Sequence, residues 1–321
     1  MRQLMISLDK KIPDPASAVA RRMIEYGKEN ELFILIPSSD KKEIKLNDTV
    51  NVFSTGGNRI QQYFRLKKMG IELIRKYDIK SITTQDPFFL GQVGYWLKKK
   101  ARVSLEVQVH GDFFGSGYYQ ATIFWKIKIF LAKFVLRRAD SVRTVGERVK
   151  QSLLKIGLEA RKILVKPIML NAESTSAPVF TQERRNFVWA GRMEPEKNLL
   201  FLIDVFSQVV RHKPDVQLVL VGEGSEKASL QKKVKQLKLE NNIKFVSWLP
   251  NPIGYIKNAQ ALLLPSLTES YGAVAMEANA SGTSIIMNDV GVANYELKPS
   301  GMVTILPIND REAWINAILD I

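Results

Sequence analysis

Short apolar runs alternate with segments of helical periodicity along the whole chain, a pattern typical of α/β folds with parallel sheets. In the first half, strands are predicted at 4–8, 32–37, 81–85, 103–109 and 141–145, with helices near 16–28, 60–77, 120–139 and 147–156. In the second half, strands are predicted at 186–191, 216–222, 243–248, 261–265, 283–287 and 302–307, again separated by helical segments.

The alternation breaks at residues 171–185, where NAESTSAPVFTQERR has no apolar periodicity and reads as a linker. We therefore predict two Rossmann-like domains, 1–170 and 171–321, a size that fits domains of about 150 residues. Open parallel sheets bind ligands at the carboxyl ends of their strands. Two such domains facing each other would place a cleft between those ends.

Charge is distributed unevenly between the halves. Residues 1–170 contain 32 Lys and Arg against 16 Asp and Glu, whereas residues 171–321 contain 15 against 16. This excess favours an anionic partner for the first half, the alternative being a solubilising surface. Cysteine is absent, which excludes disulfides and thiolate metal sites and fits a reducing cytoplasm. The sequence has no uninterrupted apolar run of about 18 residues, so no membrane-spanning helix is expected.

The strand predicted at 186–191 ends in Gly191 and is followed by Arg192 and, at a helix start, Lys197. An arginine fork, a lysine point charge and helix amides together suit a diphosphate. The alternative is that both cations are solvated and pair with Glu194 and Glu196.

A second group follows the strand at 261–265. Glu269 lies just before the next predicted helix, where a carboxylate can accept bonds from ligand hydroxyls. Ser270, Tyr271 and Gly272 offer backbone amides at the helix start, which favours phosphate. Glu277 lies two turns into the helix, where its carboxylate could accept both hydrogens of a ribose diol. For a single glutamate, a helix cap would be the simpler interpretation.

These segments resemble motifs of the family 4 retaining glycosyltransferases, which have the GT-B fold. ESYGAVAMEANASG is similar to the family's E-x7-E motif, and GRMEPEKN to its G-R-L-x-x-x-K-G motif, with Asn198 in place of the last glycine. VLVGEGSE supplies Gly222 and Gly224 of a V-G-x-G-P turn, and NNIKFVSWLPN matches a further turn with Ser247 in place of glycine. The four motifs keep the family's order over about 185–300.

The resemblance implies a donor site for a nucleotide-diphosphate sugar, with UDP and GDP both open as the nucleotide. Arg192 and Lys197 would hold the diphosphate, Glu269 would contact the transferred sugar as a catalytic residue, and Glu277 would bind the ribose. Gly191, Gly222 and the amides of 270–272 would complete the site. No metal or other cofactor is expected, because two cations and a helix dipole would take that role. The sugar would keep its anomeric configuration.

His110 follows the strand at 103–109 in VHGDFF, which is similar to the family's H-D or H-G-D loop. The family match implies that His110 is catalytic and faces the donor sugar, whereas a lone histidine is more often structural. The family's Gly-rich loop after the first strand is missing, since no glycine precedes Gly27.

Residues 121–139 combine a broad apolar stripe, including Phe124, Ile127, Leu131 and Val135, with lysines and arginines on other faces. The helix either packs on the core with a basic edge or lies on an anionic membrane surface. Basic clusters elsewhere in this half favour the second interpretation. The predicted membrane or acceptor patch comprises Lys67, Lys68, Lys98, Lys99, Lys126 and Lys133.

Enzymes that resemble this chain often glycosylate polyprenyl-diphosphate-linked sugars or other lipids. We therefore expect a glycan or lipid-linked acceptor in cell-surface polysaccharide assembly, and a peripheral location on the cytoplasmic face of a membrane. The alternatives are a GT-B enzyme with a soluble acceptor, or a sugar-nucleotide epimerase. Nucleic-acid binding is not expected, since no RRM, KH, zinc-finger or helix-turn-helix signature is present. The usual C-terminal return helix is not expected after 302–307.

Overall fold

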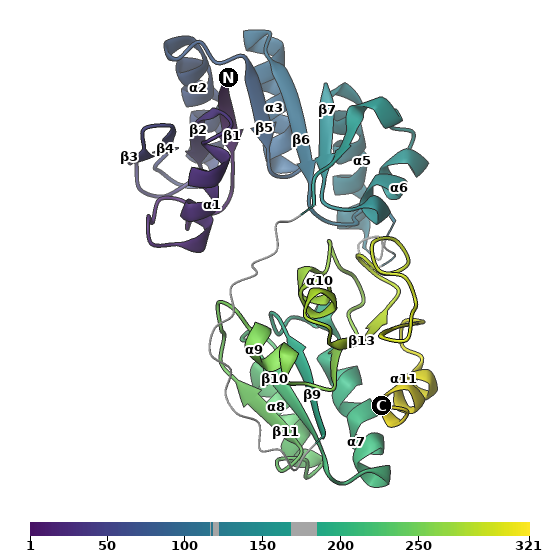
Figure 1. The fold of residues 1–321 in the computed structure, drawn as a ribbon. Coiled ribbons are helices and arrows are strands. Elements are labelled where there is room, and N and C mark those ends of the chain that lie inside the picture. The colour runs from purple at the N-terminus through teal and green to yellow at the C-terminus, as the bar shows by residue number, and fades with distance from the viewer. Residues whose placement is uncertain (116, 118–121, 168–184) are drawn as a thin grey trace. The chain divides into compact units, whose positions relative to one another are not determined.

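The computed structural model describes residues 1–115, 117, 122–167 and 185–321, which form two compact units (Figure 1). The first unit comprises residues 1–145 and 149–166, and the second comprises residues 146–148 and 167–321. The predicted boundary between residues 170 and 171 lies outside the described residues, as does the predicted linker apart from its last residue.

The first unit contains an eight-stranded sheet among the described residues, in the order β3-β4-β2-β1-β5-β6-β7-β8. All pairs are parallel except β3 with β4. The strands are β1 (Arg2–Ile6), β2 (Glu31–Ile36), β3 (Glu43–Asn47), β4 (Val50–Ser54), β5 (Ser81–Thr84), β6 (Ser104–Val109), β7 (Ser141–Thr144) and β8 (Ile163–Val165). The helices are α1 (Ala18–Tyr26), α2 (Arg59–Lys76), α3 (Phe89–Ala101), α5 (Ile123–Arg138), α6 (Glu147–Lys155) and the short η1 (Ala160–Lys162).

The β3–β4 hairpin, helix α3, the short η1 and strand β8 of this unit were not predicted from the sequence. The β3–β4 hairpin closes one edge of the sheet, and α3 crosses from β5 to β6. The sequence of α3 contains Gly91 and Gly94, which lower helix propensity. A Cβ at Gly94 would lie 2.6 Å from Thr84 Cγ2 and 2.9 Å from Leu105 Cδ1. Close packing of this helix on β5 and β6 therefore requires the glycine, and tertiary contacts outweigh propensity.

Over its described residues, the second unit contains a six-stranded parallel sheet in the order β11-β10-β9-β12-β13-β14. Its strands are β9 (Arg185–Ala190), β10 (Val216–Val221), β11 (Ile243–Val246), β12 (Ala261–Leu264), β13 (Ser284–Asn288) and β14 (Val303–Leu306). Its helices are η2 (Pro195–Lys197), α7 (Leu199–His212), α8 (Lys227–Gln236), α9 (Ile253–Lys257), α10 (Ala273–Ala280) and α11 (Arg311–Leu319).

The sequence pattern explains why these elements form. Central strands such as β2 and β10 are apolar runs buried on both faces, as expected where helices cover a parallel sheet. In α7 the buried positions Leu199, Leu202, Ile203, Phe206 and Val209 follow the helical repeat. The predicted α/β class with two parallel-sheet, Rossmann-like domains is confirmed. None of the described helices has the length and apolarity to cross a bilayer.

Candidate functional site

In the second unit, the loops that follow β9 and β10 pack directly against each other. A Cβ at Gly222 would lie 1.9 Å from the carbonyl oxygen of Gly191, and one at Gly224 would lie 2.3 Å from that of Met193. The Met193 amide donates to the Glu223 carbonyl at 2.8 Å. The glycines after β10 are therefore required for close approach of the two loops, whatever else they contact.

Arg192 projects from the loop after β9, with 70% of its side chain exposed. Its nearest carboxylate is Glu196, at 3.9 Å, a surface pair of little energetic weight. The neighbouring Glu194 is held elsewhere, since it accepts bonds from the amide and hydroxyl of Ser225, which lower its pKa. Arg192 therefore keeps its guanidinium available to an external anion.

Lys197 and Glu269 form the most buried ion pair of the second unit, counted over the described residues. The Lys197 ammonium lies 2.6 Å from Glu269 Oε1, and the two side chains are 16% and 13% exposed. The Ser266 hydroxyl donates to the same oxygen at 2.7 Å. A lysine has three N–H donors, so Lys197 retains further donors for a ligand while it orients Glu269.

Asn198 occupies the position of the glycine in the family pattern. Its backbone is left-handed, with φ of 58°, and it immediately precedes α7. Asparagine is the residue after glycine that tolerates this conformation best. Its side-chain amide also donates to the carbonyl of Pro265 at 3.2 Å and to Asn309 at 2.9 Å. The departure from the pattern therefore preserves the backbone geometry and ties the β9 and β12 loops together.

The start of α10 presents backbone amides. Gly272 is left-handed, with φ of 92°, and immediately precedes the helix. Within the described chain, the amides of Ser270, Tyr271 and Gly272 have no backbone acceptor. Tyr271 is buried, with 5% of its surface exposed. Free amides at a helix start are suited to phosphate oxygens.

Glu277 lies on α10 and is half-buried, and its carboxylate has no hydrogen-bonding or ionic partner among the described residues. Burial raises the pKa of its carboxyl group. A partly desolvated carboxylate of this kind gains free energy from any ligand that donates hydrogen bonds to it.

In the first unit, His110 ends a chain of hydrogen bonds that begins at Glu106. The Thr83 hydroxyl donates to Glu106 at 2.7 Å, Gln108 donates to Thr83 at 2.8 Å, and His110 Nε2 lies 2.9 Å from Gln108 Oε1. Because this amide oxygen can only accept, the proton of His110 resides on Nε2. Nδ1 is then an acceptor.

The His110 ring stands in a pocket wall, open to solvent on one side. Burial on its other sides, followed by repulsion from Arg143 and Arg22, lowers its pKa to about 4. His110 is thus neutral near neutral pH and can accept a hydrogen bond from a hydroxyl group.

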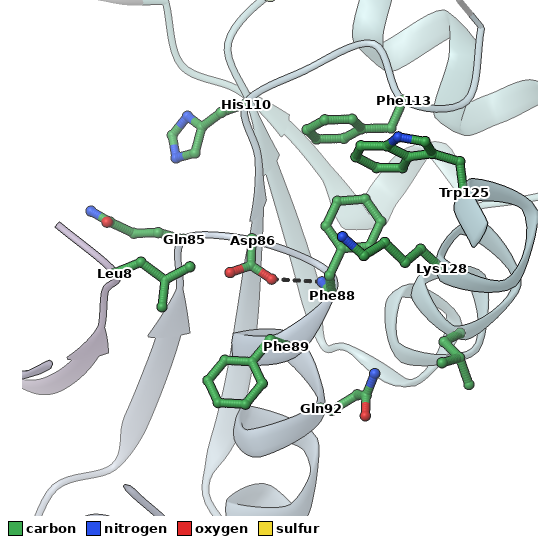
Figure 2. A pocket seen from close by; sticks show the side chains of 11 residues that line it. Leu8, Gln85, Asp86, Phe88, Phe89, Gln92, His110, Phe113, Trp125 and Lys128 are labelled. Carbon is green, nitrogen blue, oxygen red and sulfur yellow. Dashed lines mark hydrogen bonds between the residues drawn. The ribbon is translucent and has the colours of Figure 1, made fainter. Parts of the chain in front are cut away.

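That pocket has a volume of about 460 Å³ and is shown in Figure 2. Its lining joins four separate segments and is mainly apolar. It comprises Leu8, Gln85, Asp86, Phe88, Phe89, Gln92, His110, Phe113, Trp125, Lys128 and Leu131. The rings of Phe113 and Trp125 are stacked with centroids 6.2 Å apart, and Phe88 meets both edge-on. Lys128 lies over the Trp125 ring, 4.8 Å from its centroid.

Helix α5 is apolar on two opposite faces. Ile129, Ala132, Val135 and Leu136 are buried, whereas the stripe around Ile127 is open to solvent. That stripe contains Ile123 (73% exposed), Phe124 (62%), Ile127 (56%), Phe130 (73%), Leu131 (40%) and Phe134 (41%). At about 100° per residue it spans about 120° of the helix surface, with Lys126 and Lys133 on one flank and Lys128 on the other.

The predicted basic patch is distributed along the α2–α3–α5 layer. Lys68, Lys99 and Lys126 are exposed. Lys98 is paired with Asp140 at 2.6 Å and also donates to the Arg138 carbonyl. Lys67 donates to the Tyr63 hydroxyl and stacks over its ring. Lys98 and Lys67 therefore have local partners.

In the second unit, the structure brings Lys197 and Glu269 into contact although they are 72 residues apart, and the Leu267 amide donates to the Glu196 carbonyl at 2.8 Å.

Sequence reasoning did not identify Ser266, Asp86, Trp125 or Lys128 as site residues. Asp86 directly follows a predicted strand, which was the available signal for it.

Two family models match the chain and together cover most of it. Residues 172–321 match the model of the glycosyl transferases group 1, and residues 17–173 match Glycosyltransferase Family 4. The solved structure of Anabaena HepE in complex with UDP and glucose has a TM-score of 0.75 to this chain at 16% identity, covering 100% of this chain and 89% of that one. This likeness identifies the GT-B fold.

Among curated proteins, the O-antigen chain mannosyltransferase RfbU of Salmonella typhimurium is 30% identical over 210 residues, 64% of this chain and 57% of that protein. An Escherichia coli UDP-Gal:alpha-D-GlcNAc-diphosphoundecaprenol alpha-1,3-galactosyltransferase is 24% identical over 277 residues, 81% of this chain and 68% of its own length. The match thus spans little more than half of RfbU.

Proposed function

Since the chain belongs to the family 4 glycosyltransferases of GT-B fold, we propose that it transfers a sugar from a nucleotide-diphosphate sugar to a lipid-linked saccharide. The observation that carries the proposal is the Lys197–Glu269 pair, which lies beside the free amides at the start of α10. A cation, a carboxylate and helix amides together match a diphosphate joined to a sugar.

In this proposal each donor group has one role. Arg192 and Lys197 bind the diphosphate and stabilise the charge on the leaving nucleotide, so no divalent metal is required. Glu269 faces the transferred sugar and stabilises positive charge at its anomeric carbon. Glu277 accepts both hydrogens of the ribose diol. In the first unit, His110, neutral and with Nδ1 as acceptor, accepts a hydrogen bond from a sugar hydroxyl.

The proposed reaction retains the anomeric configuration. The acceptor oxygen attacks from the face that the leaving phosphate vacates, and the phosphate oxygen takes the acceptor's proton. One glycosidic bond forms as the bond from the sugar to the phosphate breaks. Its acceptor is lipid-linked, because the exposed apolar stripe of α5 with its flanking lysines suits the surface of an anionic membrane. That surface would be the cytoplasmic face.

Binding of the donor should depend on the ionisation of Glu277. Its pKa is raised by burial, so the carboxylate is lost at a higher pH than for an ordinary glutamate. We expect the affinity for a nucleotide sugar to fall as the pH is lowered, beginning at a higher pH than the titration of an ordinary glutamate, by up to tenfold per pH unit below that pKa. A nucleotide sugar is the better probe than a free nucleotide, since it lacks the terminal phosphate that ionises in this range.

The Glu277→Gln variant should bind the nucleotide sugar more weakly than the wild type at pH 8, and its affinity should lack this pH dependence. Its kcat should change little. Glu240→Gln, at an exposed position in the same unit, is the matched control. An unchanged pH profile in Glu277→Gln would exclude Glu277 as the titrating group.

Membrane association tests the acceptor side of the proposal. We expect the protein to float with vesicles that contain anionic lipid and not with neutral vesicles, and expect salt to weaken the association. Reversing the charge at Lys68, Lys99 and Lys126 should lower vesicle binding by about 1 kcal/mol per residue, on the order of 100-fold in total.

Charge reversal of Lys232 and Lys235, which are exposed on α8, provides a matched control in the other unit. Lys98 is unsuitable for this test because it is paired with Asp140. Equal flotation with neutral and anionic vesicles would contradict the electrostatic part of the proposal, and no flotation at any salt would favour a soluble acceptor.

A further inference from the structure

The pocket of the first unit holds a carboxylate oxygen that nothing in the described residues satisfies. Asp86 Oδ1 accepts from the amides of Phe88 at 2.7 Å and Leu90 at 3.2 Å, which fixes the side chain at the start of α3. Asp86 Oδ2 is buried and has no hydrogen-bonding partner there. A buried acceptor without a donor costs free energy that a ligand hydroxyl would recover. Figure 2 shows this carboxylate between Leu8 and Phe88, on the side of the pocket where His110 also lies.

The opposite side of the pocket is aromatic and carries one cation. Phe88, Phe113 and Trp125 form the wall, and Lys128 stands over it, 5.9 Å from the Phe88 centroid and 4.5 Å from that of Phe124. Lys128 forms no ion pair within the described residues. Burial raises the pKa of Asp86, and the backbone amides of Phe88 and Leu90 together with the charge of Lys128 offset part of that shift. An ammonium held on aromatic rings without a carboxylate of its own is suited to phosphate.

Leu131 and Phe89 belong both to the pocket lining and to the exposed apolar surface, with 40% and 38% of their area open. Leu131 lies within the exposed stripe of α5. The hydrocarbon surface is therefore continuous from the pocket to the outer face of the helix.

We propose that this pocket binds the acceptor as a glycosyl phospholipid, in three zones: Asp86 and His110 hold a sugar hydroxyl, Lys128 holds the phosphate next to the sugar, and the α5 stripe from Leu131 outward holds the hydrocarbon chain. The inference rests on the proposed function and specifies its acceptor. Asp86 would be a binding residue that positions the acceptor sugar. A free sugar phosphate would leave the stripe uncovered, and a plain hydrocarbon would leave the Asp86 oxygen unsatisfied.

The test measures binding of glucosyl farnesyl diphosphate, farnesyl diphosphate, farnesyl glucoside and glucose 1-phosphate to the full chain. Glucosyl farnesyl diphosphate should bind most tightly. Lys128→Gln should weaken the binding of glucosyl farnesyl diphosphate about tenfold or more and leave the binding of farnesyl glucoside unchanged, because only the phosphate contact is lost. Asp86→Asn should weaken both glycosylated lipids and leave farnesyl diphosphate unaffected. Lys155→Gln, at an exposed position on α6 of the same unit, is the matched control.

A diazirine on the farnesyl chain gives a readout that does not depend on variant folding, with adducts expected on α5 around Leu131. Nucleoside-diphosphate affinity should be unchanged in all three variants, since these residues lie in the first unit. Normal nucleotide binding with equal lipid affinity in wild type, Lys128→Gln and Asp86→Asn would overturn this inference and leave the proposed function standing. Glucose 1-phosphate bound as tightly as glucosyl farnesyl diphosphate, or adducts confined to the second unit, would also overturn it.

Discussion

Replacing Lys197 by alanine is expected to weaken nucleoside-diphosphate binding by about 100-fold, within the range for loss of a hydrogen bond to a charged group. Two effects act in the same direction. The diphosphate loses a cation, and Glu269, whose side chain is only 13% exposed, is left as an uncompensated carboxylate that repels it. Isothermal titration of both proteins with UDP and GDP measures the change.

Three comparisons isolate this effect. Arg192→Ala should cost about tenfold in affinity with no loss of stability, since that side chain is 70% exposed and weakly paired. Lys233→Ala breaks an ion pair of similar length, 2.8 Å to Asp204, and should leave nucleotide affinity unchanged. The double variant Lys197→Met/Glu269→Gln should recover thermal stability relative to Lys197→Ala without recovering affinity. If Lys197→Ala binds both nucleotides as wild type does, the diphosphate assignment is wrong.

Replacing Glu269 by glutamine is expected to reduce kcat by about 100-fold with a smaller change in KM, since a charge that acts on the transition state contributes mainly to kcat. The amide can still accept from Ser266, so the loop should keep its conformation. Steady-state transfer assays give the two constants, and proton NMR of the product gives its anomeric configuration, expected to be that of the donor. A lower affinity with an unaltered kcat would assign Glu269 to binding alone.

The donor half was the part most predictable from the sequence. Its motifs lie at the ends of apolar runs, so the strand ends after β9, β10 and β12 could be located before the structure was known. The left-handed backbone at Asn198 explains why the family's glycine could be replaced there. The contact of Lys197 with Glu269 could not be predicted, because strand order decides which loops become neighbours.

The acceptor half was less predictable, for two physical reasons. Periodicity does not distinguish the faces of a helix that is apolar on both, so the sequence could not tell which side of α5 packs on α3 and which remains exposed. The pocket is built from residues as far apart as Leu8, Asp86 and Trp125, and each is unremarkable within its own segment. The glycines of α3 weakened its helical signal although they permit its packing.

The measurement that tests the central claim most directly is calorimetric titration of the wild-type chain with UDP, GDP, ADP and CDP, in buffer with EDTA. We expect one-to-one binding of UDP or GDP, unaffected by EDTA and weakened about 100-fold by Lys197→Ala. Absence of binding for all four nucleotides, or equal binding to the wild type and to Lys197→Ala, would contradict a nucleotide-sugar site at this position.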